Sequence, residues 1–311
     1  MASLAVPLLL AVGGLMAVQA AANVQLATAM GSPAAASTLQ LAVGATLLLA
    51  LALAVGTIGS LQLVPGVTPW HLLGGVASTM WVTAGIVLLP RLGAVLSVGL
   101  LVTGQVLASL LLDGLGLLGV PAKHVTIVTL LGLAAVLAGA SLIVRSQGGR
   151  GEPQARAGWS RPAWLLFAVL AGACLPTMGA INAQLRVDLR DPIAAGLFSF
   201  VVATVAMALV LLIGLAVAGA PVPRVLRLRR VPWWGWGGGF AGATYLVSVV
   251  LLIPVIGAAP TVALTIAGQQ LASVAVDRFG LLRLPRRPIG ALRLSGVAVL
   301  LIGVALLHAI G

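Results

Sequence analysis

Residues 104–121 read GQVLASLLLDGLGLLGVP, and residues 268–285 read GQQLASVAVDRFGLLRLP. The two stretches share Gly, Gln, Leu, Ala, Ser, Asp, Gly, Leu and Pro in the same order, at a constant spacing of 164 residues (268 minus 104). Glutamine, aspartate and proline are uncommon in this chain, which is rich in Ala, Gly and Leu. Ordered matches that include them indicate an internal duplication rather than coincidence.

Further matches extend the duplication toward both ends of the chain. Asn23, Gln25, Leu26 and Pro33 recur as Asn182, Gln184, Leu185 and Pro192; Pro69, Trp70, Gly74 and Gly75 recur as Pro232, Trp233, Gly237 and Gly238; Pro90, Gly93 and Ala94 recur as Pro254, Gly257 and Ala258; Gly132 and Gly139 recur as Gly296 and Gly303. Between the copies, residues 146–162 have the polar, Gly- and Arg-rich composition of a linker. We therefore expect a first repeat over 1–145 and a second over 163–311.

The composition identifies the class of protein. Of the 311 residues, 61% are hydrophobic and only 7% are charged, and the mean hydropathy is +1.19. These values exclude a water-soluble domain and predict an all-α integral membrane protein. The net charge of +12 is then better explained by basic cytoplasmic loops than by nucleic-acid binding. The single cysteine, Cys174, excludes an internal disulfide framework and a multi-cysteine metal site.

Apolar runs long enough to cross a bilayer predict ten transmembrane helices, five in each repeat. The expected ranges are 2–22, 33–56, 70–89, 93–112 and 125–144 in the first repeat, and 163–182, 192–219, 233–253, 257–276 and 291–310 in the second. The first run resembles a signal peptide. However, it has no Lys or Arg before Gln19 and it has a counterpart after residue 162, so we expect it to be retained.

An odd number of helices per repeat requires the second repeat to cross the membrane in the opposite direction, as in inverted-repeat transporters. The basic residues test this orientation independently. With both termini outside, only Lys123, Arg186 and Arg190 of the 17 Lys and Arg residues fall outside, leaving 14 on the cytoplasmic side with the linker. We therefore predict both termini outside and residues 146–162 in the cytoplasm.

Two glutamines occupy equivalent positions inside the predicted helices. An unpaired amide in hydrocarbon is costly, so Gln105 and Gln269 are expected to point into the bundle. Thr265 lies one helical turn before Gln269, on the same ridge. These groups either hydrogen-bond the two halves together near a pseudo-twofold axis or line a substrate cavity, and both interpretations stay open.

A second group of amides lies near the end of the first predicted helix. Gln19 and Asn23 are four residues apart, and Asn182 repeats Asn23 whereas Met178 replaces Gln19. Only one half keeps the full pair, which is an asymmetry that a binding site can use. The alternative is that these amides cap helix ends before the following prolines.

Trp81, Thr244 and Tyr245 fall in the middle of the third and eighth predicted helices, away from the interfaces where Trp and Tyr normally cluster. Aromatic groups with polar tips suit the wall of a cavity for a partly apolar or cationic substrate. Simple packing is the alternative.

Ionisable groups are missing from the predicted membrane midplane. The acidic residues Asp113, Glu152, Asp188, Asp191 and Asp277 all fall in loops or at helix ends. Proton-coupled transporters usually place such a group deep in the bundle, so we expect neutral amides and hydroxyls to contact the substrate. Asp113 and Asp277 are expected to act as turn or cap residues, with a coupling-ion role as the alternative.

The sequence carries no sign of an enzyme. Its three histidines are isolated at predicted helix ends, and it has no phosphate loop, metal-ligand cluster or nucleophile with a matched base. We therefore expect no catalytic residue, metal or cofactor.

Several of the elements above carry a family resemblance. They are the Asn-x-Gln-Leu and Gly-Ser-Pro elements between Gln19 and Pro33, the stretch Pro90-Arg-Leu-Gly-Ala, the stretch Gly104-Gln-Val-Leu-Ala-Ser, and Asp113 with Gly116 and Pro121. On these elements the whole chain resembles the bacterial YdcZ family of the drug/metabolite transporter superfamily. In the second copy, Arg-Asp-Pro replaces Gly-Ser-Pro, and Pro254 is not followed by arginine.

The resemblance implies a small-molecule transporter of the fused kind, in which two five-helix units pair antiparallel. The carboxylate that small multidrug members of the superfamily use for proton exchange has no match in the first helix.

We therefore expect an exporter or exchanger of a small metabolite or amphipathic compound in the bacterial inner membrane, working by alternating access. The alternatives are a lipid flippase or scramblase and a non-transporting scaffold or sensor. The expected partners are membrane lipids and a small solute, not nucleic acid, and a monomer suffices because the fused halves form an internal pseudo-dimer.

Overall fold

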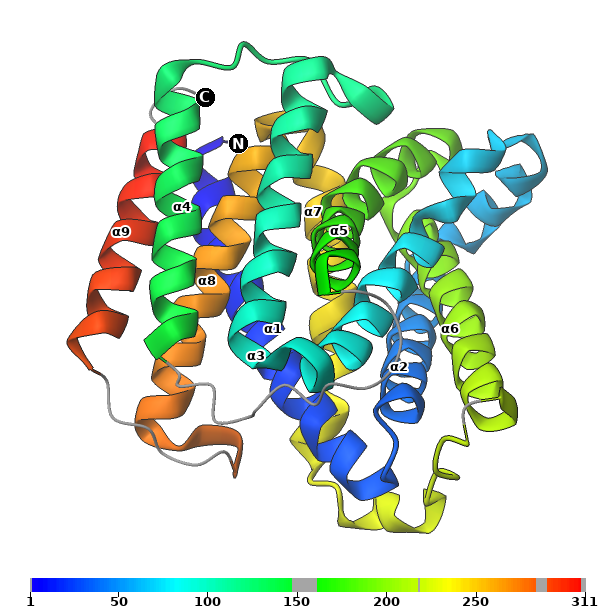
Figure 1. The fold of residues 1–311 in the computed structure, drawn as a ribbon. Helices are drawn as coiled ribbons and strands as arrows, with labels where there is room; N and C mark the ends of the chain where they lie inside the picture. Colours follow the sequence, from blue (N-terminus) through cyan, green and yellow to red (C-terminus); the bar gives the residue numbers. More distant parts are fainter. Residues whose placement is uncertain (1, 147–160, 218, 284–289, 309–311) are drawn as a thin grey trace.

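Every element in the described part of the chain is helical, which confirms the predicted class. The computed structural model describes residues 2–146, 161–217, 219–283 and 290–308 (Figure 1). Its α-helices are α1 (Ala2–Met30), α2 (Pro33–Ala54), α3 (Gly74–Leu115), α4 (Ile127–Ser146), α5 (Arg161–Leu189), α6 (Pro192–Val217), α7 (Gly238–Ile256), α8 (Ala258–Phe279) and α9 (Ala291–His308). Short 3₁₀ segments are η1 (Thr57–Gly66), η2 (Pro69–Leu73), η3 (Leu117–Gly119), η4 (Val225–Arg230), η5 (Trp233–Trp236) and η6 (Leu281–Arg283).

Nine segments of the described chain are long and apolar enough to cross a membrane. Two of them lie in α3, over Pro69–Gly93 and Leu96–Leu115. The tenth predicted span corresponds to α9, whose apolar stretch Ala291–Leu307 is shorter than the others, and positions 309–310 of that prediction lie outside the described residues. Most of the predicted linker, residues 147–160, also lies outside them.

Two glycines bend the path of the chain at equivalent positions. Residues 70–89 and 93–112 were predicted as separate helices, and the two parts of α3 correspond to them, because the backbone leaves the helical conformation at Gly93 (φ 76°, ψ 163°), just after Pro90. Gly257 has nearly the same conformation (φ 94°, ψ 166°) and separates α7 from α8. Only glycine adopts such backbone angles without strain, and proline weakens the helix before it.

The first helix of each repeat is longer than predicted, because the turn that ends it comes later. Ser32 caps α2, its hydroxyl accepting the backbone N–H of Ala35 at 3.3 Å. Asp191 caps α6 in the same way, its carboxylate accepting the backbone N–H of Ala194 at 2.6 Å. Asn23 and Asn182 therefore lie inside α1 and α5, and the alternative interpretation of these amides, that they cap helix ends, is wrong.

Contacts between the two halves occur in reciprocal pairs. A side chain on Gly104 would collide with the backbone of Val169 in α5, and a side chain on Gly268 would collide with the backbone of Leu10 in α1. The sequence repeat relates Gly104 to Gly268, and Leu10 to Val169 at the shift of 159 found for the first helices. Small residues at these crossings let the helix backbones touch.

The outer helices pair with their own counterparts in opposite directions. Gly132 of α4 contacts Gly303 of α9, whereas Gly139 contacts Gly296 seven residues earlier in α9. The order is reversed along the two helices, so they run antiparallel, and Figure 1 shows them side by side. Gly44 against Phe200 and Gly196 against Leu48 give the same reversed order for α2 and α6.

The buried core divides between these helix groups. The largest apolar cluster joins α2, α6 and α7 through Leu48, Phe200, Met207, Tyr245 and Val249. A second cluster joins α4, α8 and α9 around Val136, Ile143 and Leu300.

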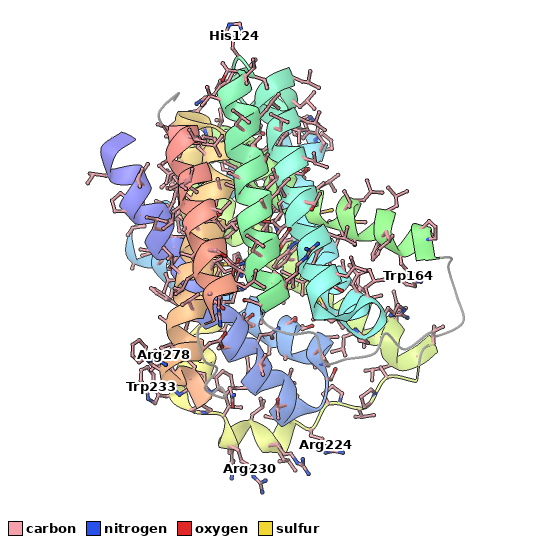
Figure 2. The ribbon with its side chains drawn as sticks, turned by 60° about the vertical axis from the view of Figure 1, so that its left-hand side comes forward. His124, Trp164, Arg224, Arg230, Trp233 and Arg278 are labelled. Atoms are coloured by element: carbon pink, nitrogen blue, oxygen red, sulfur yellow. The ribbon has the colours of Figure 1, made fainter. Side chains whose placement is uncertain are left out.

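Figure 1 shows that α1 begins and α9 ends at the same end of the bundle as the α3–α4 connection. Figure 2 places His124 at that end and Arg224, Arg230 and Arg278 at the other.

Candidate substrate site

Four polar side chains of α1 and α2 form a cluster that we call the amide cluster: Gln19, Asn23, Ser37 and Gln40. The Asn23 amide donates to the Ser37 hydroxyl at 3.3 Å, and the Gln40 amide donates to the backbone carbonyl of Gln19 at 3.2 Å. The side-chain oxygens of Gln19 and Asn23 are buried and accept no hydrogen bond within the described part of the chain. The cluster therefore presents two free acceptors one helical turn apart.

Helix α7 packs against the amide cluster through two of its glycines. The Gln40 amide occupies the space that a side chain on Gly238 would need. A Cβ on Gly242 would lie 2.9 Å from the Gln19 amide nitrogen and 3.4 Å from the Phe200 ring. Any larger residue at these glycines would displace the amides, so α7 and α1 are matched in shape here.

Ser37 and Gln40 were not among the residues that the sequence pointed to. The signal for them was present, because Gln40 is an amide in an apolar helix, as Gln105 and Gln269 are. Both are almost fully buried, at 4% and 6% exposure. Their hydrogen bonds depend on how α1 and α2 pack, which residue spacing does not reveal.

The equivalent position in the second half holds a single amide with no partner. Asn182 of α5 is fully buried, and neither its oxygen nor its nitrogen makes a hydrogen bond within the described residues. It packs against Gly74 at the start of α3. Gly196 takes the place of Ser37 in this half and Met178 that of Gln19, so the partners are missing. An unsatisfied buried amide costs about 1–3 kcal/mol.

The two predicted glutamines lie beside the glycine crossings between the halves. Gln105 is 7% exposed and Gln269 is half-buried. Neither makes a hydrogen bond to another described residue, so the contact between the halves here comes from Gly104 and Gly268. A role for the glutamines in substrate binding stays a prediction.

The remaining predicted site residues lie in three different surroundings. Trp81 packs in a cluster with Leu88 and Leu101, and its indole N–H is buried without a partner in the described chain. Tyr245, at the equivalent position of α7, lies in the same apolar cluster as Phe200. The hydroxyls of Thr244 and Thr265 donate to carbonyls of their own helices, at 2.9 Å and 3.0 Å. The structure therefore brings together only Gln19 and Asn23 in one polar cluster.

Asp113 and Lys123 form a clamp on the break between α7 and α8. The Asp113 carboxylate accepts the backbone N–H groups of Ala258 at 2.6 Å and Ala259 at 2.7 Å, which begin α8. The Lys123 ammonium donates to the carbonyl of Ile256, at the end of α7, at 2.6 Å. Each charge complements the helix end it meets. Asp113 is thus a cap, as predicted, but of a helix in the other half.

The counterpart of Asp113 has a different partner. Asp277 accepts from the guanidinium of Arg293 at 2.7 Å, and the same guanidinium reaches the Ser273 hydroxyl at 3.3 Å. Arg293 belongs to α9 and is only 3% exposed. The equivalent carboxylates Asp113 and Asp277 therefore have different partners at the two ends of the bundle.

The prediction that all three histidines are isolated is wrong for His71. Its ring forms a close ion pair with the Asp188 carboxylate near the end of α5. The Trp70 ring also meets it edge to face, with centroids 4.0 Å apart. The sequence did not indicate this pair because the two residues are 117 positions apart.

Comparison with known proteins identifies the family. The family described as "Putative inner membrane exporter, YdcZ" matches this chain twice, over residues 4–142 and over residues 163–306. A solved structure described as "Crystal structure of protein" has a similar fold, with a TM-score of 0.67 and 16% sequence identity over 98% of this chain and 97% of that one. No curated protein matches the chain. The two segments cover most of the chain, which therefore belongs to the YdcZ family of inner-membrane exporters in the drug/metabolite transporter superfamily.

Proposed function

We propose that this chain exports or exchanges a small metabolite or amphipathic compound by alternating access between two inverted five-helix repeats, 1–145 and 163–311. The observation that carries the proposal is that the buried side-chain oxygens of Gln19 and Asn23, and both polar atoms of Asn182 at the position equivalent to Asn23, have no hydrogen-bond partner within the described residues. Buried polar groups are normally satisfied. Buried amide atoms that lack a partner beside glycines of the neighbouring helices suit a substrate that supplies the missing hydrogen bonds.

The reciprocal contacts support the inverted arrangement and ten membrane crossings. Equivalent helices α4 and α9 run antiparallel, as do α2 and α6. A twofold rotation that exchanges two antiparallel helices has its axis perpendicular to the helices. For helices that span a bilayer, such an axis lies in the membrane plane. In this arrangement α9 crosses as the tenth helix.

The charge distribution supports an orientation with both termini outside and residues 146–162 in the cytoplasm. Arg224, Arg230 and Arg278 share one end of the bundle in Figure 2, opposite His124. Arg150, Arg156, Arg286 and Arg287, which the sequence assigns to the same side, lie outside the described residues. Cytoplasmic loops carry the excess of Lys and Arg.

The substrate class follows from the groups that the site offers. Gln19 and Asn23 present acceptor oxygens, and Asn182 presents both an acceptor and a donor. No described carboxylate bonds to the amide cluster. A neutral solute with hydroxyl or amide groups and an apolar part matches these amides and the adjoining Phe200 and Tyr245.

The different contacts of Asp113 and Asp277, at opposite ends of the bundle, support alternating access. Asp113 and Lys123 hold the α7–α8 break at one end, whereas Asp277 at the other end pairs with Arg293. Equivalent groups with unequal contacts are what one state of a two-state inverted-repeat cycle requires.

Flux into proteoliposomes is the test of this proposal. The purified protein is reconstituted and exposed to a library of neutral and amphipathic metabolites, with and without a pH gradient, and to fluorescent lipids in parallel. We expect saturable movement of one solute class with no lipid flipping. Lipid movement without solute flux would contradict the proposal and favour a flippase. Strict dependence on the pH gradient would count against a neutral site and point to Asp113 and Asp277.

A further inference from the structure

A basic and apolar surface stands exposed at one end of the bundle, on the segment between α6 and α7. We call it the η4 surface, and its residues are Arg224, Leu226, Arg227, Arg229, Arg230 and Trp233. Leu226 is 90% exposed and Trp233 is 86% exposed, and all four arginines are exposed as well. In Figure 2, Arg224 and Arg230 project away from the bundle.

The backbone under this surface is anchored to the bundle. The N–H of Arg224 donates to the carbonyl of Met30, at the end of α1, at 2.9 Å. Leu228 and Val231 pack against Leu26 and Met30 in a small apolar cluster. The buried residues hold the segment in place, so the outward side chains are displayed by the fold.

The arginines of the η4 surface have no carboxylate partner in the described part of the chain. The described ion pairs are His71 with Asp188 and Arg293 with Asp277. The sequence has no Asp or Glu between Pro192 and Val276. The surface therefore keeps its full positive charge beside large apolar side chains.

The fold itself does not require this charge. The segment in the equivalent position of the first half includes η1, Thr57–Gly66, whose sequence TIGSLQLVPG has no charged residue.

We propose that the η4 surface binds the headgroups of anionic phospholipids in the leaflet that it faces. Arginine guanidinium groups bind phosphate oxygens in a bidentate geometry. Leu226 and Trp233 suit the boundary between headgroups and acyl chains, where Trp is enriched. Basic segments beside membrane helices attract anionic lipid in this way. This binding is independent of the substrate that the protein exports.

The test compares the full chain in nanodiscs of phosphatidylcholine alone and of an equal mixture of phosphatidylcholine and phosphatidylglycerol. We expect the midpoint of thermal unfolding to rise in the mixture. The triple variant Arg227→Gln, Arg229→Gln and Arg230→Gln is expected to lose most of that rise while matching the unmodified protein in phosphatidylcholine. The variant Arg190→Gln, before α6, is the matched control and is expected to keep the rise.

Three outcomes overturn the proposal. They are no effect of phosphatidylglycerol on the unmodified protein, the same rise in the triple variant, and an equal rise on adding inorganic phosphate to phosphatidylcholine nanodiscs. The midpoint does not depend on transport, so these outcomes leave the proposed export function to be judged by flux.

Discussion

At the scale of single residues, the same amide meets two different environments in the two halves. Asn23 donates to Ser37, whereas the residue that the repeat aligns with Ser37 is Gly196, and Asn182 makes no hydrogen bond within the described residues. A buried amide without partners destabilises the fold by about 1–3 kcal/mol. A residue that costs stability at an interior position is a candidate for function.

Replacing Asn182 separates a functional amide from a structural one. In Asn182→Leu the unpaired group is gone, so we expect stability to stay the same or rise by about 1–3 kcal/mol. We expect flux of the identified solute to fall about three- to tenfold, the worth of one lost hydrogen bond. Thermal unfolding in detergent and proteoliposome flux measure the two effects.

The variant Gly196→Ser is the matched control for Asn182. A Cβ added at Gly196 would make only ordinary van der Waals contacts, and the nearest atom would be a side-chain carbon of Val247 at 3.4 Å. Because the repeat aligns Gly196 with Ser37, we expect the new hydroxyl to reach the Asn182 amide, raise stability and lower flux. A loss of both stability and flux in Asn182→Leu would show that the amide is structural.

At the scale of elements, the helices of the two halves touch through glycines. Gly104 faces the carbonyl of Val169, while Gly99, in the same helix, has open space around it. Backbone contact of this kind is how helices associate inside a bilayer, where the hydrophobic effect does not drive them together.

Adding a single methyl group to α3 is expected to have opposite effects at these two glycines. Gly104→Ala forces α3 away from α5 and should lower the unfolding free energy by about 1–3 kcal/mol. Gly99→Ala should raise it by up to about 1 kcal/mol, because alanine favours the helix. Denaturation in detergent compares the two. Equal effects would mean that the α3–α5 crossing is not close-packed.

The clamp at the α7–α8 break makes a prediction about access from one end. In a variant with Cys174 replaced by Ser, Ser109 is replaced by cysteine, one turn before Asp113. Its reaction with an impermeant maleimide reports opening of the bundle from this end. Ser109 is fully buried. Losing about 1 kcal/mol of capping by Asp113→Ala should speed labelling about fivefold. Asp277→Ala, at the other end of the bundle, should not speed it, and equal rates in all three proteins would exclude a gating role.

At the scale of the whole molecule, charge and helix direction together predict how the chain sits in the membrane. The start of α1 and the end of α9 share one end of the bundle with the α3–α4 connection, and Arg224 and Arg230 of the η4 surface lie at the other (Figures 1 and 2). From the positive-inside rule we predict that the arginine-rich end lies in the cytoplasm.

Labelling of intact cells checks this orientation. With Cys174 replaced by Ser, a cysteine in place of His124 should react with an impermeant maleimide added outside. A cysteine in place of Arg230 should react only after the membrane is opened. The reverse pattern would overturn the orientation but not the antiparallel pairing of equivalent helices.

Much of the fold could be predicted from the sequence, and little of the candidate site. Apolar runs and the double Gly-Gln-x-Leu-Ala-Ser element located the helices. Capping by Asn23 was predicted from its nearness to Pro33, but Ser32 occupies the capping position, and α1 continues to Met30. Ser37, Gln40 and the His71–Asp188 pair were missed because their partners lie on other helices.

The sequence by itself determined the membrane class, the duplication and the asymmetry of charge, because lipid demands long apolar runs and leaves arginines at the ends. Only the tertiary structure decided which duplicated polar groups found partners. Asn23 donates to Ser37, Asn182 makes no hydrogen bond within the described part of the chain, and Asp113 accepts hydrogen bonds from the start of α8. A hydrogen bond depends on a distance of about 3 Å between atoms, and that distance is set by how helices far apart in the chain pack together.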